Sequence, residues 1–396
     1  MLEIFVDKKE NQEKVALVEN GNIIEYYEED ENTDRKEGNI YIGTVRDIVP
    51  GMQSAFVDIG TEKNSFIHLK DILPKIDEKM EKFESNIDIR KVIKTDEKLL
   101  VQIKKDSNDK KGARVSTHIN LPGKYIVLMP NTSFITVSQK IEDKKEQERL
   151  VNLVKDNIGE NNGAIIRTSA QNKEKEILQD IEILEKKWKK IQEKYNKKIL
   201  ENDDKEKLVY QSEDIVDKML LDLANDKIEA IVTNNKEKYE EFLKDREKTI
   251  ELKATKIMFE NSDVLDRYDI KKQIEKMQNR KIWLKCGGFI TVDKTEALTA
   301  IDVNTGKYTG NGSLEQTLYK VNEEATIEIA KQLRLRDIGG IIIIDYIDMK
   351  SQEDKDKIQR LLEYRLKFDR SKTQVEGFTK LDLMEMTRKH ICSHKE

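Results

Sequence analysis

Apolar and polar residues alternate along the first third of the chain, a pattern that predicts short β-strands. In residues 1–36 the alternation runs through Val15, Leu17 and Ile23, with an Asn-Gly-Asn turn between two of the strands. Residues 37–119 continue with "IYIGTVRDIVPGMQSAFVDIGTEKNSFIHLKDI", "KLLVQIKKDS" and "GARVSTHI", in which Gly and Pro separate the strands. Five short strands with such corners indicate a small closed barrel.

Residues 120–277 mix strand and helix periodicities. Strands are expected at "KYIVLMP", "SFITVSQKI", "GAIIRTS" and "KIEAIVTNN", and polar helices from about residue 143 and at "KEKYEEFLKDR". A long helix is predicted between them because apolar residues recur every three or four positions, which indicates a packing or dimer face. These residues are Ile177, Ile181, Leu184, Trp188, Ile191 and Tyr195.

Residues 278–396 show two strands, a helix and a further strand. "GGFITVD" and "ALTAIDV" are joined by the short turn "KTE", and Ser313 with Gln316 forms a capping box that begins the helix. We expect the glycine pair at 339–340 to end that helix. The following "IIIID" is apolar throughout, as in strands that are covered on both faces.

Two strands of this last block end in an aspartate. Asp302 closes "LTAID" and Asp345 closes "IIIID". A carboxylate within a buried strand is costly unless it is paired or binds a metal. Because open α/β sheets place their chemistry at the carboxyl ends of strands, neighbouring strands about 5 Å apart would bring both carboxylates to one ion.

An oxygen-rich site of this kind suits Mg²⁺ or Mn²⁺, and Asn304 and Asp348 stand close enough in sequence to help. Zinc fits less well, because no Cys or His cluster lies near the two aspartates in sequence. The alternative is that both aspartates are structural and cap turns. Two aspartates that each follow an apolar run favour the metal site.

Composition restricts the class of protein. The 396 residues hold 72 Lys and Arg against 77 Asp and Glu, a net charge of -5 that excludes a wholly basic binder, so any nucleic-acid contact is local. The first residues lack the basic end and apolar core of a signal peptide, and no stretch approaches about 18 consecutive apolar residues. Cys286 and Cys392 cannot build a disulfide framework. We expect a soluble, cytoplasmic protein.

Two phenylalanines of the predicted barrel are candidates for contacts with nucleic acid. Phe56 and Phe66 fall on adjacent strands, and an aromatic platform in a basic groove is what an OB barrel uses to stack bases. The alternative is that both phenylalanines belong to the barrel core. The basic groove would be lined by His68, Lys70, Lys104, Lys105, Lys110 and Lys111.

Several long motifs resemble the RNase E/G family of endoribonucleases. "TEALTAIDVNTGKYTG", "AKQLRLRDIGGIIIIDYIDM" and "LMEMTRK" look like its signature, and the likeness extends through "VALVENGNIIEYY", "IYIGTVRDIVPGMQSAFVDIG" and "IIRTS". The motifs occur in order over essentially the whole chain. The resemblance is therefore specific.

The resemblance implies an α/β and β multidomain protein. It implies an RNase H-like subdomain that is interrupted by an OB-fold RNA-binding barrel and a 5′-sensor region and followed by a DNase I-like catalytic α/β subdomain. The corresponding residues are 1–36 and 213–277 for the RNase H-like subdomain, 37–119 for the barrel, 120–212 for the sensor region and 278–396 for the catalytic subdomain.

The resemblance also implies site residues. Asp302 and Asp345 match the Mg²⁺ ligands and Asn304 the residue that assists them, while Phe56, Phe66 and Lys111 match the RNA contacts of the barrel. Arg167 and Thr168 match the pocket for a 5′-monophosphate. Lys140 and Lys372 stand where the family usually has arginines, and a lysine supplies charge without a bidentate fork.

The activity that these matches imply is Mg-dependent cleavage of single-stranded RNA by metal-activated water, leaving 5′-phosphate and 3′-hydroxyl ends. The substrates would be mRNA or rRNA precursors in RNA processing and decay, with a preference for 5′-monophosphorylated RNA. The alternatives are a non-catalytic RNA-binding adaptor, which would not need the two aspartates, and a metal-dependent DNA nuclease, which the barrel disfavours.

The resemblance allows a homodimer. Family members usually carry a paired-cysteine motif after "EMTRK" that shares one zinc between two protomers, whereas this chain shows only Cys392 with His394. Because a structural zinc needs four ligands on a fixed scaffold, we expect no zinc-linked dimer.

Overall fold

The computed structural model describes residues 1–30, 36–72, 88–107, 111–201, 206–223, 227–248, 254–307 and 313–391. The chain divides into two compact units, one formed by residues 1–33 and 226–396 and the other by residues 34–225. No helix in the described part of the chain is long and apolar enough to cross a membrane.

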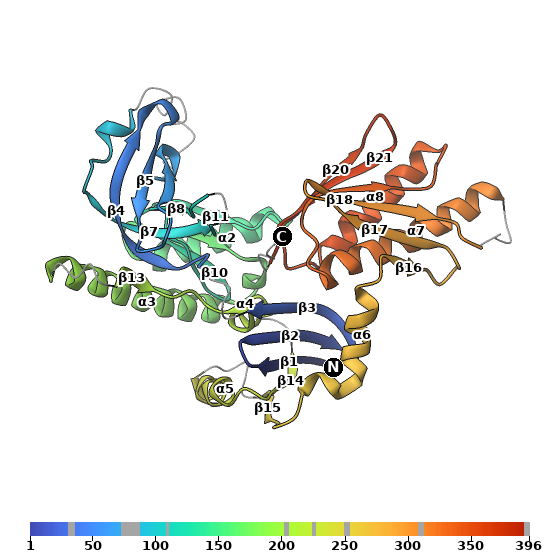
Figure 1. Cartoon of the computed structure of the whole chain (residues 1–396), viewed down its shortest axis with the longest axis horizontal. Helices are drawn as coiled ribbons and strands as arrows, with labels where there is room; N and C mark the ends of the chain where they lie inside the picture. Colours follow the sequence, from blue (N-terminus) through green and yellow to red (C-terminus); the bar gives the residue numbers. More distant parts are fainter. Residues whose placement is uncertain are drawn as a thin grey trace. The chain divides into compact units, whose positions relative to one another are not determined.

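The first unit contains a mixed sheet built from both of its chain segments (Figure 1). Strands β1, β2 and β3 form an antiparallel meander, and β1 pairs in parallel with β14, which pairs in parallel with β15. The strands are β1 (Leu2–Lys9), β2 (Gln12–Glu19), β3 (Asn22–Asp30), β14 (Ile228–Thr233) and β15 (Lys256–Phe259). Helices α5 (Lys236–Lys248) and α6 (Ile270–Met277) follow β14 and β15. The predicted hairpin turn near Asn20 and the strand and helix expected after residue 226 are confirmed.

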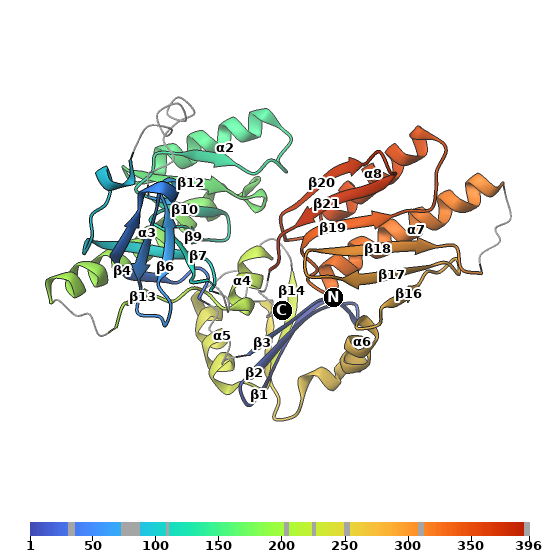
Figure 2. The same ribbon diagram turned by 45° about the horizontal axis from the view of Figure 1, so that its top comes forward.

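The same unit holds a second sheet in the order β16-β17-β18-β19-β21-β20, with helices α7 and α8 packed against it (Figure 2). Helix α7 connects β18 to β19, and these two strands pair in parallel. The elements are β16 (Lys281–Trp283), β17 (Phe289–Lys294), β18 (Leu298–Asn304), α7 (Leu314–Leu335), β19 (Gly340–Asp345), α8 (Gln352–Leu366), β20 (Thr373–Phe378) and β21 (Leu383–Arg388). The predicted strand, crossover helix and neighbouring strand are confirmed.

Helices α7 and α8 cover one face of this second sheet, and the other face carries exposed residues in the part of the chain that the structure describes. Ile342 and Ile344 are fully buried in a core that includes residues of α7 and α8, whereas Ile341 is 52% exposed on the other face. The expectation that "IIIID" is covered on both faces is therefore wrong. Alternate residues of the strand point to the helix-covered core and to the open face, and isoleucine stands on both faces. Because the residue type does not alternate, the sequence pattern cannot show which face is buried.

Helix α7 begins as predicted and ends earlier. Its Ser313 and Gln316 form the reciprocal capping box. The helix stops at Leu335, and Asp337 takes the left-handed conformation (φ 47°) before the glycine pair is reached, so the prediction that the glycines end the helix is wrong. Asp337 is fixed there because its carboxylate, with that of Asp369, accepts hydrogen bonds from the buried guanidinium of Arg388.

A buried carboxylate ties β3 to helix α7 and to the segment before β20 in the same unit. Glu25 is fully buried and accepts hydrogen bonds from Arg334 and Arg370 at 2.6 Å each and from the Tyr27 hydroxyl at 2.9 Å. Burial by itself would raise the pKa of Glu25, but Arg370 and Arg334 outweigh it and hold the pKa at about 2. The ion pairs thus keep the carboxylate charged inside the fold.

The second unit begins with the predicted barrel. Strands β4, β5, β6, β8 and β7 follow one another around it, and pairing of β4 with β7 closes it, so the prediction of a small closed barrel is confirmed. The strands are β4 (Ile40–Val49), β5 (Ser54–Asp58), β6 (Ser65–His68), β7 (Lys98–Lys105) and β8 (Arg114–Ser116), with β13 (Leu208–Tyr210) added beside β4. Its core includes the buried residues Val45, Val57, Ile67 and Val101.

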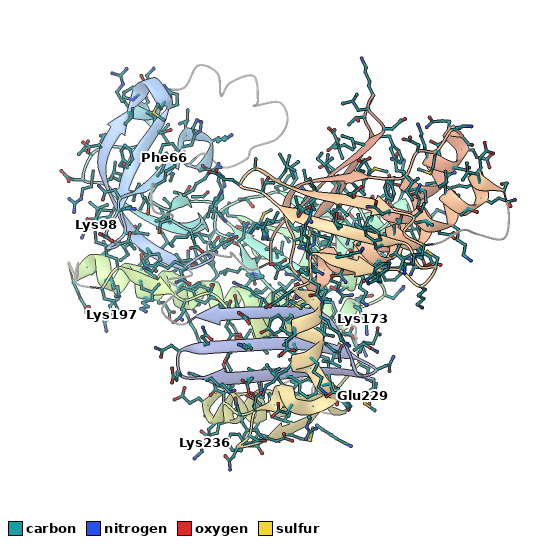
Figure 3. The ribbon with its side chains drawn as sticks, turned by 45° about the vertical axis from the view of Figure 1, so that its right-hand side comes forward. Phe66, Lys98, Lys173, Lys197, Glu229 and Lys236 are labelled. Carbon is teal, nitrogen blue, oxygen red and sulfur yellow. The ribbon has the colours of Figure 1, made fainter. Side chains whose placement is uncertain are left out.

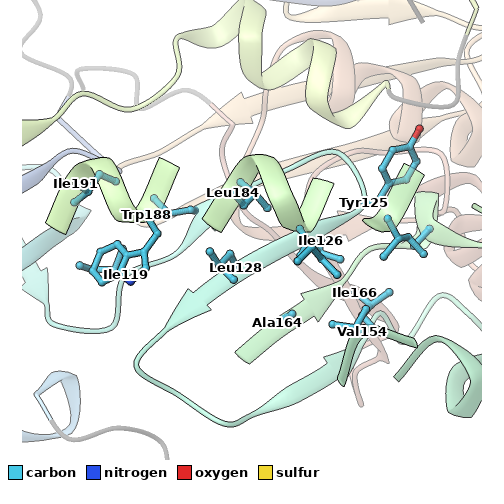
Figure 4. Close-up of a cluster of buried hydrophobic side chains, with 14 of the residues drawn as sticks. Ile119, Tyr125, Ile126, Leu128, Val154, Ala164, Ile166, Leu184, Trp188 and Ile191 are labelled. Atoms are coloured by element: carbon cyan, nitrogen blue, oxygen red, sulfur yellow. The ribbon is translucent and has the colours of Figure 1, made fainter. Parts of the chain in front are cut away.

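The rest of this unit is a small sheet in the order β11-β12-β10-β9, packed against two helices. The elements are β9 (Leu121–Pro122), β10 (Ile126–Pro130), β11 (Ile135–Val137), α2 (Lys144–Asn157), β12 (Asn162–Ile166), α3 (Glu174–Leu200) and α4 (Ile215–Asp222). The apolar stripe of α3 faces the sheet, where Leu184 and Trp188 pack near Leu128 (Figure 4), so the stripe is a packing face. Assignment of the sheets to RNase H-like, OB and DNase I-like folds, and the domain boundaries, stay predictions.

Candidate catalytic and RNA-binding sites

Asp302 and Asp345 lie directly opposite each other on the open face of the second sheet. They are register partners in the parallel pair of β18 and β19, and both side chains are exposed. Along β18 the pattern alternates, with Ile301 and Val303 buried and Asp302 facing out. The premise that Asp302 sits inside the fold is thus wrong, and the register brings the two carboxylates together without burying them.

The carboxylates form a cluster of negative charge. The Asn304 amide donates to Oδ2 of Asp302 over 2.6 Å. Partial burial and the charges of Asp302 and Asp348 raise the pKa of Asp345. Among the described residues, neither Asp302 nor Asp345 forms an ion pair. A cation would offset this repulsion.

The donor set fits a hard cation that keeps part of its water shell. Within the described ranges, no group of three or more His, Cys, Asp or Glu side chains is arranged to hold a metal ion. The site offers two carboxylates and an amide oxygen. Mg²⁺ is commonly held in proteins by one or two carboxylates together with water and phosphate oxygens, so the residues present fit it.

The two barrel phenylalanines form a cross-strand pair on the barrel surface. Phe56 on β5 is the register partner of Phe66 on β6, and their ring centroids lie 6.2 Å apart in an edge-to-face arrangement. Phe56 is 39% exposed and Phe66, labelled in Figure 3, is half-buried. Neither residue belongs to the buried core of the barrel. The core alternative is therefore wrong for both rings.

Basic residues stand next to the pair. Lys111 is exposed, and the following Gly112 passes so close to Asn64 that a Cβ would meet its carbonyl oxygen at 2.0 Å, which fixes the path of the chain beside β6. Arg114 is the register partner of Phe66 and forms a bidentate ion pair with Asp71. Sequence reasoning missed Arg114, because its place beside Phe66 depends on the β6–β8 pairing. Lys110 lies outside the described residues.

The sensor candidates of this unit meet at the ends of two parallel strands. Because β11 and β12 run in parallel, the residues that follow Val137 and Ile166 emerge at the same edge. The Ser138 and Thr168 hydroxyls are 2.9 Å apart, and Ser138 Oγ accepts from the Lys140 backbone N–H. Lys140, Arg167 and Thr168 are thereby brought together. Lys372 belongs to the other unit, and its place in this group stays a prediction.

Arg167 is held by an acidic residue that sequence reasoning missed. Its Nη1 donates to Oδ1 of Asp222, the last residue of α4, over 2.5 Å, while its buried Nε has no hydrogen-bond partner. The sequence gives no direct indication of this contact, since 55 residues separate the two positions. The arginine is therefore already oriented, with one buried donor still unsatisfied.

Cys392 and His394, considered for zinc, lie outside the described residues. The prediction that no zinc links two protomers therefore stays a prediction. Cys286 is a free, half-buried thiol whose backbone N–H donates to Glu324.

Known proteins resemble this chain over most of its length. The model of the "Ribonuclease E/G family" matches residues 120–391. Ribonuclease G of Escherichia coli (strain K12) is 37% identical over 394 residues, which cover 98% of this chain and 79% of that protein. Ribonuclease G of Haemophilus influenzae has the same identity and coverage. Ribonuclease E of Nostoc sp. is 32% identical over 359 residues, 89% of this chain and 51% of that protein.

Proposed function

The chain belongs to the ribonuclease E/G family and is an endoribonuclease, and from this premise we propose that it cleaves single-stranded RNA at the Asp302–Asp345 pair with Mg²⁺ as cofactor. The observation that carries the proposal is the direct register of these two carboxylates on an open sheet face. Family membership favours an enzyme over the non-catalytic adaptor considered from the sequence.

The two aspartates and Asn304 would have different tasks. Asp302 and Asp345 would hold the cation from two neighbouring strands, and Asn304 orients Asp302 through its amide. When bound, Mg²⁺ lowers the pKa of a coordinated water molecule and stabilises negative charge on the scissile phosphate. The open face leaves the carboxylates accessible to an extended strand of RNA. Hydrolysis would then leave 5′-phosphate and 3′-hydroxyl ends.

The second unit would bind and position the substrate. Phe56 and Phe66 present rings on which unpaired bases can stack, and the exposed Lys111 supplies positive charge for the backbone. Arg167, Thr168 and Lys140 would hold a 5′-monophosphate, which gives the preference for monophosphorylated ends. We expect the enzyme to act on mRNA or rRNA precursors in the cytoplasm.

The test is cleavage of a single-stranded A/U-rich RNA with and without Mg²⁺, by the wild type and by Asp302→Asn and Asp345→Asn. Each substitution removes one negative charge from the cation site and leaves the barrel intact. Both variants should nearly lose cleavage and still bind RNA. Asp356→Asn on helix α8 is the matched control, since its carboxylate is exposed on a helix packed against the other side of the sheet. Turnover at the wild-type rate in either site variant would sink the proposal.

A further inference from the structure

An aromatic pair, of which one ring is exposed and the other is partly buried, lies on the same open face as the two carboxylates. Trp283 on β16 is 58% exposed and is the register partner of Phe289 on β17. Their ring centroids are 5.4 Å apart and their planes are inclined by 62°. A tryptophan with this much exposed surface contributes little to the core, so its position calls for another explanation.

The pair is surrounded by positive charge. Lys281 Nζ lies 4.2 Å from the Trp283 ring centroid and 3.5 Å from that of Phe289, so both rings accept the same cation. Lys285 and Lys307 are exposed nearby in the turns that flank β17 and β18, where the Lys307 N–H faces the Gly287 carbonyl. Aromatic rings interleaved with lysines are suited to bases and phosphates.

Strand register places this pair beside the carboxylates. Phe289 is the partner of Asn304, and Thr291, two residues further along β17, is the partner of Asp302. Partners across a sheet point to the same face, and so do residues two apart, so Phe289 and Asp302 share one face. One strand spacing combined with two residues of rise gives a separation of about 8 Å, which a neighbouring nucleotide of a bound strand can span.

We propose that Trp283 and Phe289 form a base-stacking subsite that holds a nucleotide adjacent to the scissile phosphate of the RNA, with Lys281 moving from the rings to the backbone phosphate when RNA binds. The inference rests on the proposed function, because it takes Asp302 and Asp345 as the place of cleavage. It adds a specificity-determining subsite on the catalytic sheet that is separate from the phenylalanines of the barrel.

An RNA base accounts for the pair better than a protein partner does. The core of a protein-binding patch is depleted in charged residues, lysine among them, whereas here the rings are flanked by Lys281, Lys285 and Lys307. Base stacking also explains why the pair lies only two residues along the strands from the row of the carboxylates, on the same face. Tyr364 on α8 and Phe368 in the turn after that helix form a second edge-to-face pair in this unit, and both rings are exposed. Because α8 packs against the opposite face, they serve as the matched control.

Tryptophan fluorescence tests stacking without cleavage. The chain has two tryptophans, and Trp188 is buried at 6% exposure, so Trp188→Phe in the Asp302→Asn background leaves Trp283 as the single fluorophore. A short A/U-rich single-stranded RNA should quench its emission, and an abasic sugar-phosphate oligomer of equal length should not. Should Trp188→Phe fail to fold, the difference between Asp302→Asn proteins with and without Trp283→Phe gives the same readout. Equal quenching by both oligomers, or none by RNA, would overturn the proposal.

Steady-state kinetics provide the second readout. Trp283→Ala should raise the KM for the short RNA by about 5- to 150-fold, the range expected from the loss of one base–aromatic stack, with a smaller change in kcat. Trp283→Tyr should restore most of the affinity, and Tyr364→Ala should leave both constants unchanged. An unchanged KM in Trp283→Ala overturns the subsite while cleavage still depends on Asp302. Cleavage that survives Asp302→Asn overturns the proposed function instead, whatever Trp283→Ala does.

Discussion

The side chain of Asn304 donates a 2.6 Å hydrogen bond to Asp302, two residues earlier on the same face of β18. The bond fixes one oxygen of a carboxylate that is otherwise exposed to solvent. Asn304 therefore acts as a positioning residue for the proposed cation ligand.

Asn304→Ala should lower cleavage by about 10- to 100-fold at limiting Mg²⁺, because removal of a residue that orients a metal ligand costs roughly that factor in affinity or activity. Raising the Mg²⁺ concentration should restore part of the rate. Rate profiles against Mg²⁺ check this, with the exposed Asn279→Ala as control. A reduced rate with an unchanged Mg²⁺ midpoint would show that Asn304 does not act through the cation.

Phe56→Ala and Phe66→Ala should each weaken binding of single-stranded RNA by roughly 1 to 3 kcal/mol, the value of one base stacked on an aromatic ring. Thermal unfolding should change little, because both rings lie outside the buried core of the barrel. Binding and melting curves check the two statements. Phe134→Ala, which removes an exposed ring outside the barrel, is the control. If one of the variants unfolds, that phenylalanine is part of the barrel core and the stacking role is wrong for it.

Arg167→Ala should abolish the preference for 5′-monophosphorylated RNA and leave cleavage of 5′-hydroxyl RNA unchanged, because the residue positions an end and does not touch the carboxylate pair. Asp222→Asn should have the opposite effect and strengthen the preference, since it releases the guanidinium from its ion pair. The ratio of kcat/KM on the two substrates measures both. Equal losses on both substrates in Arg167→Ala would instead give the arginine a role in the fold or the general RNA path.

Acid should destabilise the first unit through Glu25. Burial opposes ionisation of this group, but Arg370 and Arg334 hold its pKa at about 2, below the ordinary value of 4.5. The lowered pKa contributes on the order of 3 kcal/mol to the free energy of unfolding. This contribution is complete above about pH 4.5 and is lost as the pH falls toward 2.

Glu25→Gln should remove that part of the acid dependence and lower the free energy of unfolding at neutral pH by about 3 to 5 kcal/mol, because two arginines lose their buried partner. Urea denaturation at a series of pH values measures both effects. Glu19→Gln, at an exposed position of β2, should follow the wild type. Parallel curves for wild type and Glu25→Gln would show that the ion pairs contribute no acid dependence.

The features that depend on residues close together in the sequence were predicted correctly. The apolar spacing of α3, the capping box at Ser313 and the short strands of the barrel are each specified by residues a few positions apart, and all are present. The adjacency of Asp302 and Asp345 was also predictable, because a crossover helix between two strands favours their parallel pairing. Local periodicity carries this information.

Contacts set by distant register were not predictable. The position of Trp283 near Asp302 follows from the pairing of β16 with β17 and of β17 with β18, which the sequence does not show. Likewise, Asp222 contacts Arg167 from a separate helix. Glu25 pairs with Arg334 and Arg370 across separations of 309 and 345 residues. The exposed face of "IIIID" was misjudged for a related reason: isoleucine at every position conceals which face meets solvent.

The parallel pairing of β1 with β14 has a consequence for biosynthesis. The ribosome makes β1 to β3 first, but their partner strand emerges only after residues 34–225 have been translated. At about 5 to 20 residues per second this takes roughly 10 to 40 s. During that interval the edge of β1 that will pair with β14 has no partner strand. The intervening unit can already fold around its own cores. Nascent chains stalled just before residue 228 should therefore display β1 as an open edge, the point at which chaperone binding or misassembly would compete with completion of the fold.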